Sequence, residues 1–252
     1  MEAIGVIPAR YSSSRFSGKV LADICGKPMI QHVWERAKRA LLLDEVIVAC
    51  DEESVFAVAS DFGANCVMTA KGHLSGSDRI TEVVNPIDVK VVVNIQADEP
   101  LIEPLMIDRL AETLLGDNSI YMATIIKKIE NSNEINNPNI VKVVVDKNNF
   151  ALYFSRAPIP YRAENAEIEP IYYKHIGLYA YTKDFLFTYK NMPSSTLEGV
   201  EKLEQLRVLE EGFRIKVIET KVDTIGVDTP QDLERVRKII AKEQLCQEKK
   251  SD

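Results

Sequence analysis

The first part of the chain alternates short apolar runs with amphipathic segments, and this alternation constrains the fold more than any other feature of the sequence. Apolar runs typical of buried strands lie at residues 3–7, 45–50, 65–69 and 90–95. Segments with the apolar periodicity of helices lie at residues 27–40, 52–62, 77–84 and 104–115. Continuous apolar strands separated by helices are typical of a parallel sheet covered on both faces. We therefore predict an α/β fold with a mostly parallel sheet and helices on both faces.

The pattern changes in the second half of the chain. Strand-like segments follow one another with few helices between them, at residues 120–129, 140–146, 150–156 and 174–181. A charged helix, a strand and a last helix are expected at residues 197–212, 213–220 and 229–244. The 252 residues fit one large domain. We predict a single domain over residues 1–252 that contains a smaller strand-rich lobe, with mixed or antiparallel pairing, at approximately residues 120–190.

The charge balance limits the partners of the chain. Acidic residues outnumber basic ones by 38 to 31, and the formal net charge is −7. Broad binding to nucleic acid or to an anionic membrane needs a dense basic face. We therefore expect no nucleic-acid partner.

Cysteine usage and hydropathy indicate the compartment. The four cysteines form no CxxC pair, and we expect reduced thiols. The chain begins with a strand-like segment and gives no sign of a signal peptide. No run approaches the roughly 18 apolar residues of a membrane-spanning helix. We expect a cytoplasmic protein that is not inserted into a membrane.

The loop after the first predicted strand carries cations among small polar residues. Its cations are Arg10, Arg15 and Lys19, and serines stand at positions 12, 13, 14 and 17. Backbone N–H groups of such a loop can cradle an anion, and the cations can bond to phosphate oxygens. The alternative is a solvated connecting loop. Because three cations and several serines share one loop after a strand, we favour phosphate binding.

Two carboxylates stand where a metal–phosphate site would be expected. Asp98, with Glu99 beside it, follows the fourth predicted strand directly, and Asp228 precedes the last predicted helix. Ligands of parallel sheets sit outside the carboxyl ends of the strands, and Mg²⁺ takes one or two carboxylates together with phosphate oxygens. The alternative is that each aspartate only caps a turn or a helix, and the spacing in the sequence does not decide between them.

Other polar positions have a structural and a functional interpretation. Ser75 or Ser77 can cap the helix that starts near residue 77, while the loop backbone and Arg79 could frame a base or ribose. Arg156 suits a substrate carboxylate through a bidentate contact. His175 lies in a strand, where a lone histidine is more often structural.

Taken together, these residues resemble a known family over about residues 3–240, the 3-deoxy-manno-octulosonate cytidylyltransferases, also called CMP-Kdo synthetases. The opening loop is similar to the family stretch IPARYxSxRxPGKPL. Six further signatures follow in the family's order: SGSDR, QADEPLI, YFSRAPIPY, HIGLYAY, EQLRVLE and GVDTPQDLERV. The last four distinguish this family from the sialic-acid cytidylyltransferases.

The resemblance implies a Rossmann-like nucleotidyltransferase fold, a homodimer formed through the smaller lobe, and a reaction. The anomeric hydroxyl of 3-deoxy-manno-octulosonate (Kdo) attacks the α-phosphate of CTP, giving CMP-Kdo for lipopolysaccharide assembly and pyrophosphate. Lys19, Arg10, Asp98 and Asp228 are implied as catalytic residues, with Mg²⁺ on the two aspartates. The implied CTP contacts are Arg10, Ser13, Arg15, Lys19, Ser75, Gly76 and Arg79. The implied Kdo contacts are Gln96, Arg156, His175, Tyr179, Glu204 and Gln205.

Two alternatives to this function stay open. The acceptor could be 8-amino-Kdo or another 2-keto sugar acid, since an amine in place of a hydroxyl can depend on few residues. The chain could also be an inactive nucleotide-binding homologue. The retention of both Asp98 and Asp228 argues against inactivity, because nucleotide binding alone does not require both metal carboxylates.

Overall fold

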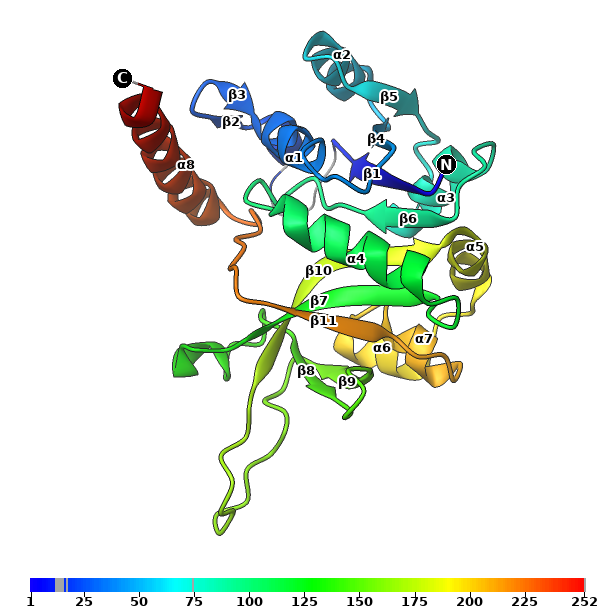
Figure 1. Cartoon of the computed structure of the whole chain (residues 1–252), viewed down its shortest axis with the longest axis vertical. Helices are drawn as coiled ribbons and strands as arrows, with labels where there is room; N and C mark the ends of the chain where they lie inside the picture. The colour runs from blue at the N-terminus through cyan, green and yellow to red at the C-terminus, as the bar shows by residue number, and fades with distance from the viewer. Residues whose placement is uncertain (12–15, 17, 74, 252) are drawn as a thin grey trace. The chain divides into compact units, whose positions relative to one another are not determined.

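A computed structural model describes residues 1–11, 16, 18–73 and 75–251 of the chain, with side chains described up to residue 246 (Figure 1). The chain divides into two compact units. The first consists of Met1–Asp108 and Thr224–Asp252, and the second of Arg109–Asp223. The second unit includes the segment 120–190 that was predicted as a strand-rich lobe.

The first unit is built on four parallel strands. They are β1 (Ala3–Ala9), β4 (Glu45–Cys50), β5 (Asn65–Met68) and β6 (Val91–Asn94), in the order β6–β1–β4–β5. Every residue of β1 except Pro8 is buried, as expected for a strand with both faces covered. The parallel arrangement places the carboxyl ends of these strands at one edge of the sheet. The predicted parallel α/β sheet is confirmed.

Helices follow the strands of the first unit in the predicted order. They are α1 (Met29–Ala37), α2 (Glu53–Asp61), α3 (Gly76–Val84) and α8 (Pro230–Ser251), and α4 (Pro104–Gly116) carries the chain into the second unit. A 3₁₀ turn, η1 (Lys19–Leu21), and a short hairpin of β2 (Asp23–Ile24) and β3 (Lys27–Pro28) precede α1. The predicted start of α1 at residue 27 is wrong, because Lys27 and Pro28 pair with β2 and Pro28 is the extended N-cap residue of the helix.

The second unit has a mixed sheet, as predicted. Its strands are β7 (Met122–Lys128), β8 (Lys142–Val145), β9 (Ala151–Ser155), β10 (Tyr173–Thr182) and β11 (Lys216–Thr220). β11 runs parallel to β7, whereas the β7–β10, β10–β8 and β8–β9 pairs are antiparallel. The unit also contains a 3₁₀ turn, η2 (Ser132–Glu134).

The helices of the second unit differ from the sequence-based prediction. The single helix expected at 197–212 is two short helices, α6 (Thr196–Glu201) and α7 (Leu206–Glu210). They separate because Lys202 adopts a left-handed conformation with φ 56°. Gly212 follows α7 with φ 78°, the conformation of the predicted glycine cap. A further helix, α5 (Lys183–Asn191), was not predicted and is capped by the Thr182 hydroxyl.

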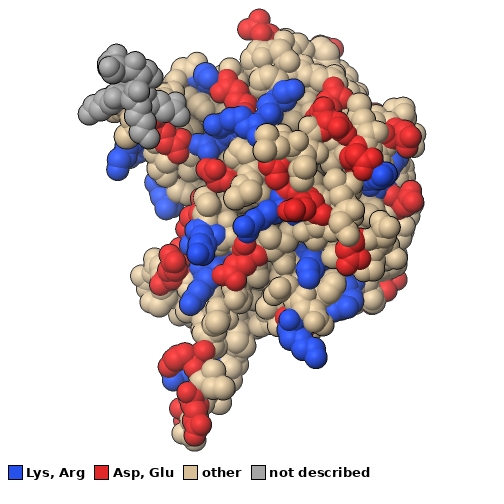
Figure 2. Space-filling view, in the orientation of Figure 1, with Lys and Arg blue, Asp and Glu red and all other residues tan. Residues whose placement is uncertain are grey.

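The connection between β9 and β10, residues 156–172, extends beyond β8 and β9 (Figure 1). We call residues 156–172 the arm. Its apolar side chains include Tyr161 and Ile168, which are 84% and 82% exposed. Acidic side chains gather at the end of the arm, and Arg162 pairs with Glu169 at 2.7 Å (Figure 2). The arm therefore presents apolar side chains that this single chain does not bury.

In the described part of the chain, no helix combines the length and the apolar character needed to cross a bilayer.

Candidate active site

Lys19 holds two aspartates together in the first unit. Its ammonium Nζ donates to Asp98 Oδ2 at 2.6 Å, to Asp228 Oδ1 at 3.2 Å and to the Val227 carbonyl at 3.1 Å. Lys19 stands on η1 directly after Gly18, whose left-handed backbone (φ 70°) turns the chain into this 3₁₀ helix. The fold thus brings together three predicted catalytic residues that lie 79 and 209 positions apart in the sequence.

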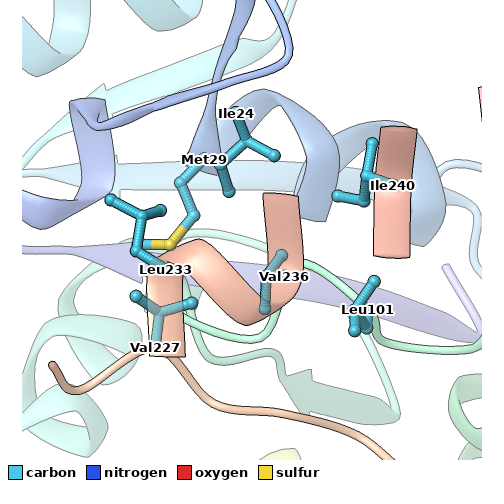
Figure 3. Close-up of a cluster of buried hydrophobic side chains, with 7 residues drawn as sticks. All are labelled: Ile24, Met29, Leu101, Val227, Leu233, Val236 and Ile240. Atoms are coloured by element: carbon cyan, nitrogen blue, oxygen red, sulfur yellow. The ribbon is translucent and has the colours of Figure 1, made fainter. Parts of the chain in front are cut away.

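Main-chain bonds and apolar packing fix the two aspartates. Asp98 lies in the turn after β6, where the Glu99 N–H donates to the Gln96 carbonyl at 3.2 Å. The Val227 N–H donates to the Asp98 carbonyl at 2.8 Å, which joins this turn to the segment before α8. Beneath them lies a buried cluster composed of Ile24, Met29, Leu101, Val227, Leu233, Val236 and Ile240 (Figure 3). Asp228 is therefore held by the cluster through its neighbour Val227.

Glu99, which follows the same predicted strand as Asp98, carries a carboxyl group whose Oε2 atom is buried. Burial, and then the neighbouring charge of Asp98, raises the pKa of Glu99 to about 8, although a bond from the Thr224 side chain opposes this. Its Oε2 atom has no hydrogen-bond partner among the described residues. The turn that carries Asp98 therefore also carries a carboxyl group whose protonated form is favoured by burial.

The two aspartates suit a hard divalent cation. A cation already bridges them in this structure, namely the Lys19 ammonium, and both carboxylates are partly exposed, at 30% and 46% of their side chains. In the part of the chain that the structure describes, no group of three or more histidine, cysteine or acidic side chains is arranged to hold a metal. Mg²⁺ commonly takes one or two carboxylates and fills its octahedron with waters and phosphate oxygens. The residues present therefore fit Mg²⁺ that arrives with a phosphate ligand.

The predicted cytidine loop is a helix start. The Ser75 hydroxyl accepts from the Asp78 N–H at 3.1 Å, and the Asp78 carboxylate accepts from the Ser75 N–H at 3.1 Å, which forms a capping box. The capping interpretation of Ser75 is thus confirmed. A Cβ on Gly76 would lie 3.4 Å from Pro8, so Gly76 allows α3 to approach the end of β1 closely.

Arg79 lies beneath this loop with none of its surface exposed. Its guanidinium donates to Asp51 Oδ2 at 2.9 Å and to the Thr69 hydroxyl, while Nε has no partner among the described residues. Asp51 Oδ1 also accepts from the Tyr11 N–H at 3.2 Å. Asp51, which was not predicted although it directly follows a strand, therefore links α3 to Tyr11, at the start of the loop predicted to bind phosphate.

Two further predicted residues of the first unit, Arg10 and Gln96, lie at or near the ends of strands. Arg10 directly follows β1 and is exposed, and the Gln96 amide donates to Asn94 Oδ1 at 3.1 Å. Ser13 and Arg15 lie outside the described residues, so the structure does not describe their predicted contacts with CTP.

In the second unit, Arg156 is bonded mainly to main chain. Its Nε donates to the Glu201 carbonyl at 2.8 Å and its Nη1 to the Pro138 carbonyl at 2.9 Å. The Glu201 carboxylate in turn accepts from the Arg156 N–H at 2.9 Å and from the Ser155 hydroxyl at 2.6 Å. These bonds use Nε and Nη1 of the guanidinium, and neither involves Nη2.

Four further predicted residues lie among aromatic rings of the second unit. The His175 and Tyr179 rings stand 5.2 Å apart, and a row of rings continues through Tyr181 to Tyr189. The Tyr189 hydroxyl contacts Glu204 Oε2 at 3.4 Å. Gln205 is buried, and its Nε2 has no partner among the described residues. An amide donor left unpaired in a protein interior is costly, so this one is suited to a ligand acceptor.

Comparison with known proteins identifies the family. Residues 4–219 match the family model described as cytidylyltransferase. A 3-deoxy-manno-octulosonate cytidylyltransferase of Solibacter usitatus is 50% identical over 94% of this chain and 93% of its own. Its namesake from Geotalea uraniireducens is 49% identical over 94% of this chain and 98% of its own.

A solved structure supports the same family. It is described as CMP:2-keto-3-deoxy-manno-octonic acid synthetase complexed with CTP, and it matches with a TM-score of 0.91 and 45% identity over 96% of this chain and all of the other. The predicted nucleotidyltransferase fold is thereby confirmed. On the family model, the curated relatives and the solved structure together, the chain belongs to the 3-deoxy-manno-octulosonate cytidylyltransferase family.

Proposed function

We propose that this protein transfers CMP from CTP to the anomeric hydroxyl of Kdo. The hydroxyl oxygen forms a bond to the α-phosphorus, the bond from that phosphorus to the bridging oxygen of pyrophosphate breaks, and the hydroxyl proton is lost to solvent. The products are CMP-Kdo, for lipopolysaccharide assembly, and pyrophosphate. The observation that carries the proposal is the contact of Lys19 with both Asp98 and Asp228 in a chain of this family.

Charge neutralisation is the main task of the residues around Lys19. CTP and Kdo are both anionic, so their encounter is repulsive, and phosphoryl-type transfer depends on positioning and electrostatics. We assign Lys19, Arg10, Ser13 and Arg15 to the triphosphate. Ser75, Gly76 and Arg79 are assigned to the cytidine, with Arg79 acting from below the loop through Asp51 and Thr69.

Asp98 and Asp228 would hold Mg²⁺. When bound there, Mg²⁺ would offset phosphate charge and lower the pKa of the attacking hydroxyl. The Lys19 ammonium, which bonds to the same carboxylates in this structure, would then be released to pair with phosphate oxygens.

The predicted contacts to Kdo are Gln96, Arg156, His175, Tyr179, Glu204 and Gln205. Nε2 of Gln205, which has no partner among the described residues, supports this assignment, because a sugar acid offers hydrogen-bond acceptors. 8-Amino-Kdo or another 2-keto sugar acid is the second candidate acceptor, since an amine can make many of the same hydrogen bonds as a hydroxyl.

We further propose a homodimer in the cytoplasm. The exposed apolar side chains of the arm, Tyr161 and Ile168, support a second copy of the chain as their partner. All four cysteines are free thiols, which supports a reducing compartment.

The test is release of pyrophosphate from CTP in the presence of Mg²⁺, with and without Kdo. We expect release that requires both Kdo and Mg²⁺ and that 8-amino-Kdo supports less well. Folded protein that binds CTP without releasing pyrophosphate would identify an inactive homologue instead. Release with 8-amino-Kdo alone would reassign the acceptor.

A further inference from the structure

Strand β10 contains a bulge opposite Thr124 of β7. Ile176 pairs with Ile125 and Tyr179 with Thr124, so Gly177 and Leu178 have no partners on β7. Thr124 is fully buried at this point. Bulges of this kind re-aim side chains and are common beside active sites. Here the bulge separates His175 from Tyr179, two residues assigned to the sugar acid.

The Thr124 hydroxyl meets three groups of β10. Its Oγ1 lies 2.8 Å from the Leu178 carbonyl oxygen, 3.3 Å from the Ile176 carbonyl oxygen and 2.9 Å from Nε2 of His175. A hydroxyl has one proton to donate, and a carbonyl oxygen can only accept. If that proton were directed to Nε2, two oxygens 2.8 Å apart would face each other without a proton between them. The hydroxyl therefore donates to Leu178, and His175 Nε2–H donates to Oγ1.

The other ring nitrogen is consequently an acceptor. Burial lowers the pKa of His175 to about 3, so the ring is neutral at pH 7 and carries one N–H. With that proton on Nε2, Nδ1 presents a lone pair, and none of the hydrogen bonds among the described residues uses it. The rings of Phe154 and Tyr179, at 5.1 and 5.2 Å, flank the imidazole and restrict its rotation.

We propose that Thr124 is a positioning residue that holds His175 as the Nε2–H tautomer, so that Nδ1 accepts a hydrogen bond from a hydroxyl of the bound sugar acid. This inference rests on the proposed function. It makes Thr124 a determinant of which sugar acid the site selects, because a site built around a fixed hydrogen-bond acceptor discriminates against analogues that lack the matching donor.

The tautomer is tested without catalysis. In the ¹⁵N-labelled full chain, long-range ¹H–¹⁵N spectra separate protonated from unprotonated ring nitrogens, and loss of signals in His175→Gln assigns them. We expect a protonated Nε2 and an unprotonated Nδ1 in the wild type and in Thr124→Ser. Thr124→Val, which keeps the shape and removes the hydroxyl, should show a mixture of tautomers. A protonated Nδ1 in the wild type would overturn the inference, even if Thr124→Val did not fold.

Kinetics test the consequence. Thr124→Val should raise the KM for Kdo about tenfold, on the scale of one lost hydrogen bond, with the KM for CTP unchanged and kcat changed less. Thr124→Ser should restore the KM for Kdo to within about threefold of the wild type. Equal rises in both KM values would mean a general structural defect and contradict a positioning role. If the wild type lacks Kdo-dependent turnover, the proposed function fails while the spectra still decide the tautomer.

Discussion

Gly226 packs against the carboxyl group of Glu99: a Cβ placed on Gly226 would stand 2.9 Å from Oε1 of Glu99. Oε2 of Glu99 is buried, so a side chain at 226 must displace either the Glu99 carboxyl group or the backbone that leads to Asp228. This contact makes Gly226 part of the geometry of the Lys19–Asp98–Asp228 cluster although it carries no functional group.

Gly226→Ala should therefore lower turnover. Overpacking of this size costs about 1–3 kcal/mol, and small displacements of catalytic groups can cost up to about 10²-fold in rate. We expect kcat to fall at least about tenfold, measured as pyrophosphate release. Gly199→Ala is the matched control, because its Cβ meets no atom within 4 Å. Wild-type kcat in Gly226→Ala would show that the site tolerates the shift.

Asp98→Asn should separate nucleotide binding from turnover. The amide keeps the shape of the side chain but loses the charge that pairs with Lys19 and that would hold Mg²⁺. We expect CTP binding by calorimetry to persist and turnover to fall at least about 10²-fold, the scale of losing one key electrostatic group. Asp61→Asn, at the exposed end of α2, is the control. Near wild-type turnover would rule out Asp98 as an essential metal ligand.

The buried imidazole of His175 should make stability depend on pH. Its pKa is about 3 in the folded protein against 6.5 when unperturbed, so the unfolded state binds a proton that the folded state does not. As pH falls below 6.5, the free energy of unfolding should decrease by about 1.4 kcal/mol per pH unit from this residue alone. Urea unfolding between pH 7.5 and 4.5 measures it against His175→Gln, which lacks the titrating group. Parallel profiles for the two proteins would contradict the low pKa.

The arm should decide the oligomeric state. Ile168 is 82% exposed in the single chain, and an aspartate there would place a charge in the proposed dimer interface. We expect Ile168→Asp to shift the protein from dimer to monomer in sedimentation equilibrium. Val200→Asp is the control, because Val200 is also an exposed apolar residue, at 75%, but lies on α6. An unchanged dimer in Ile168→Asp would exclude this part of the arm from the interface.

Loss of a side chain from the apolar cluster next to Asp228 should lower both the free energy of unfolding and the turnover. Leu233→Ala removes a buried side chain from it (Figure 3), which should cost about 2–5 kcal/mol of unfolding free energy. Because the cluster includes Val227, turnover should fall as well. Leu245→Ala, at an exposed position of the same helix, should change neither quantity in denaturant unfolding and turnover assays. Stability lost without any loss of turnover would separate the cluster from the site.

Sequence patterns predicted the elements that depend on local periodicity. The parallel strands and the helices that follow them come from apolar runs whose period differs between strand and helix. The break between α6 and α7 could not be predicted in this way, because it depends on a left-handed lysine at 202, and lysine carries no local signal for that conformation. The start of α1 was misjudged because Pro28 pairs in a hairpin whose partner lies before it.

Within the site, residue types and their order indicated Lys19, Asp98 and Asp228 as candidate site residues. The contacts that form only on folding could not be predicted from the sequence. Arg79 is as consistent with a ligand contact as with a buried structural cation until its bonds to Asp51 and Thr69 are known. Thr124 lies 51 positions from His175 in a strand with no motif of its own, and only the register of β7 and β10 brings the two together.

The first unit is discontinuous, and this bears on how the protein is made. Lys19 and Asp98 leave the ribosome early, but Asp228 and the α8 residues that pack beneath it come after the whole second unit has been synthesised. A nascent or truncated chain that ends before this segment lacks Asp228 and four members of the cluster next to it, Val227, Leu233, Val236 and Ile240. A truncated product that ends within the second unit is therefore expected to lack the Lys19–Asp228 ion pair and the proposed turnover.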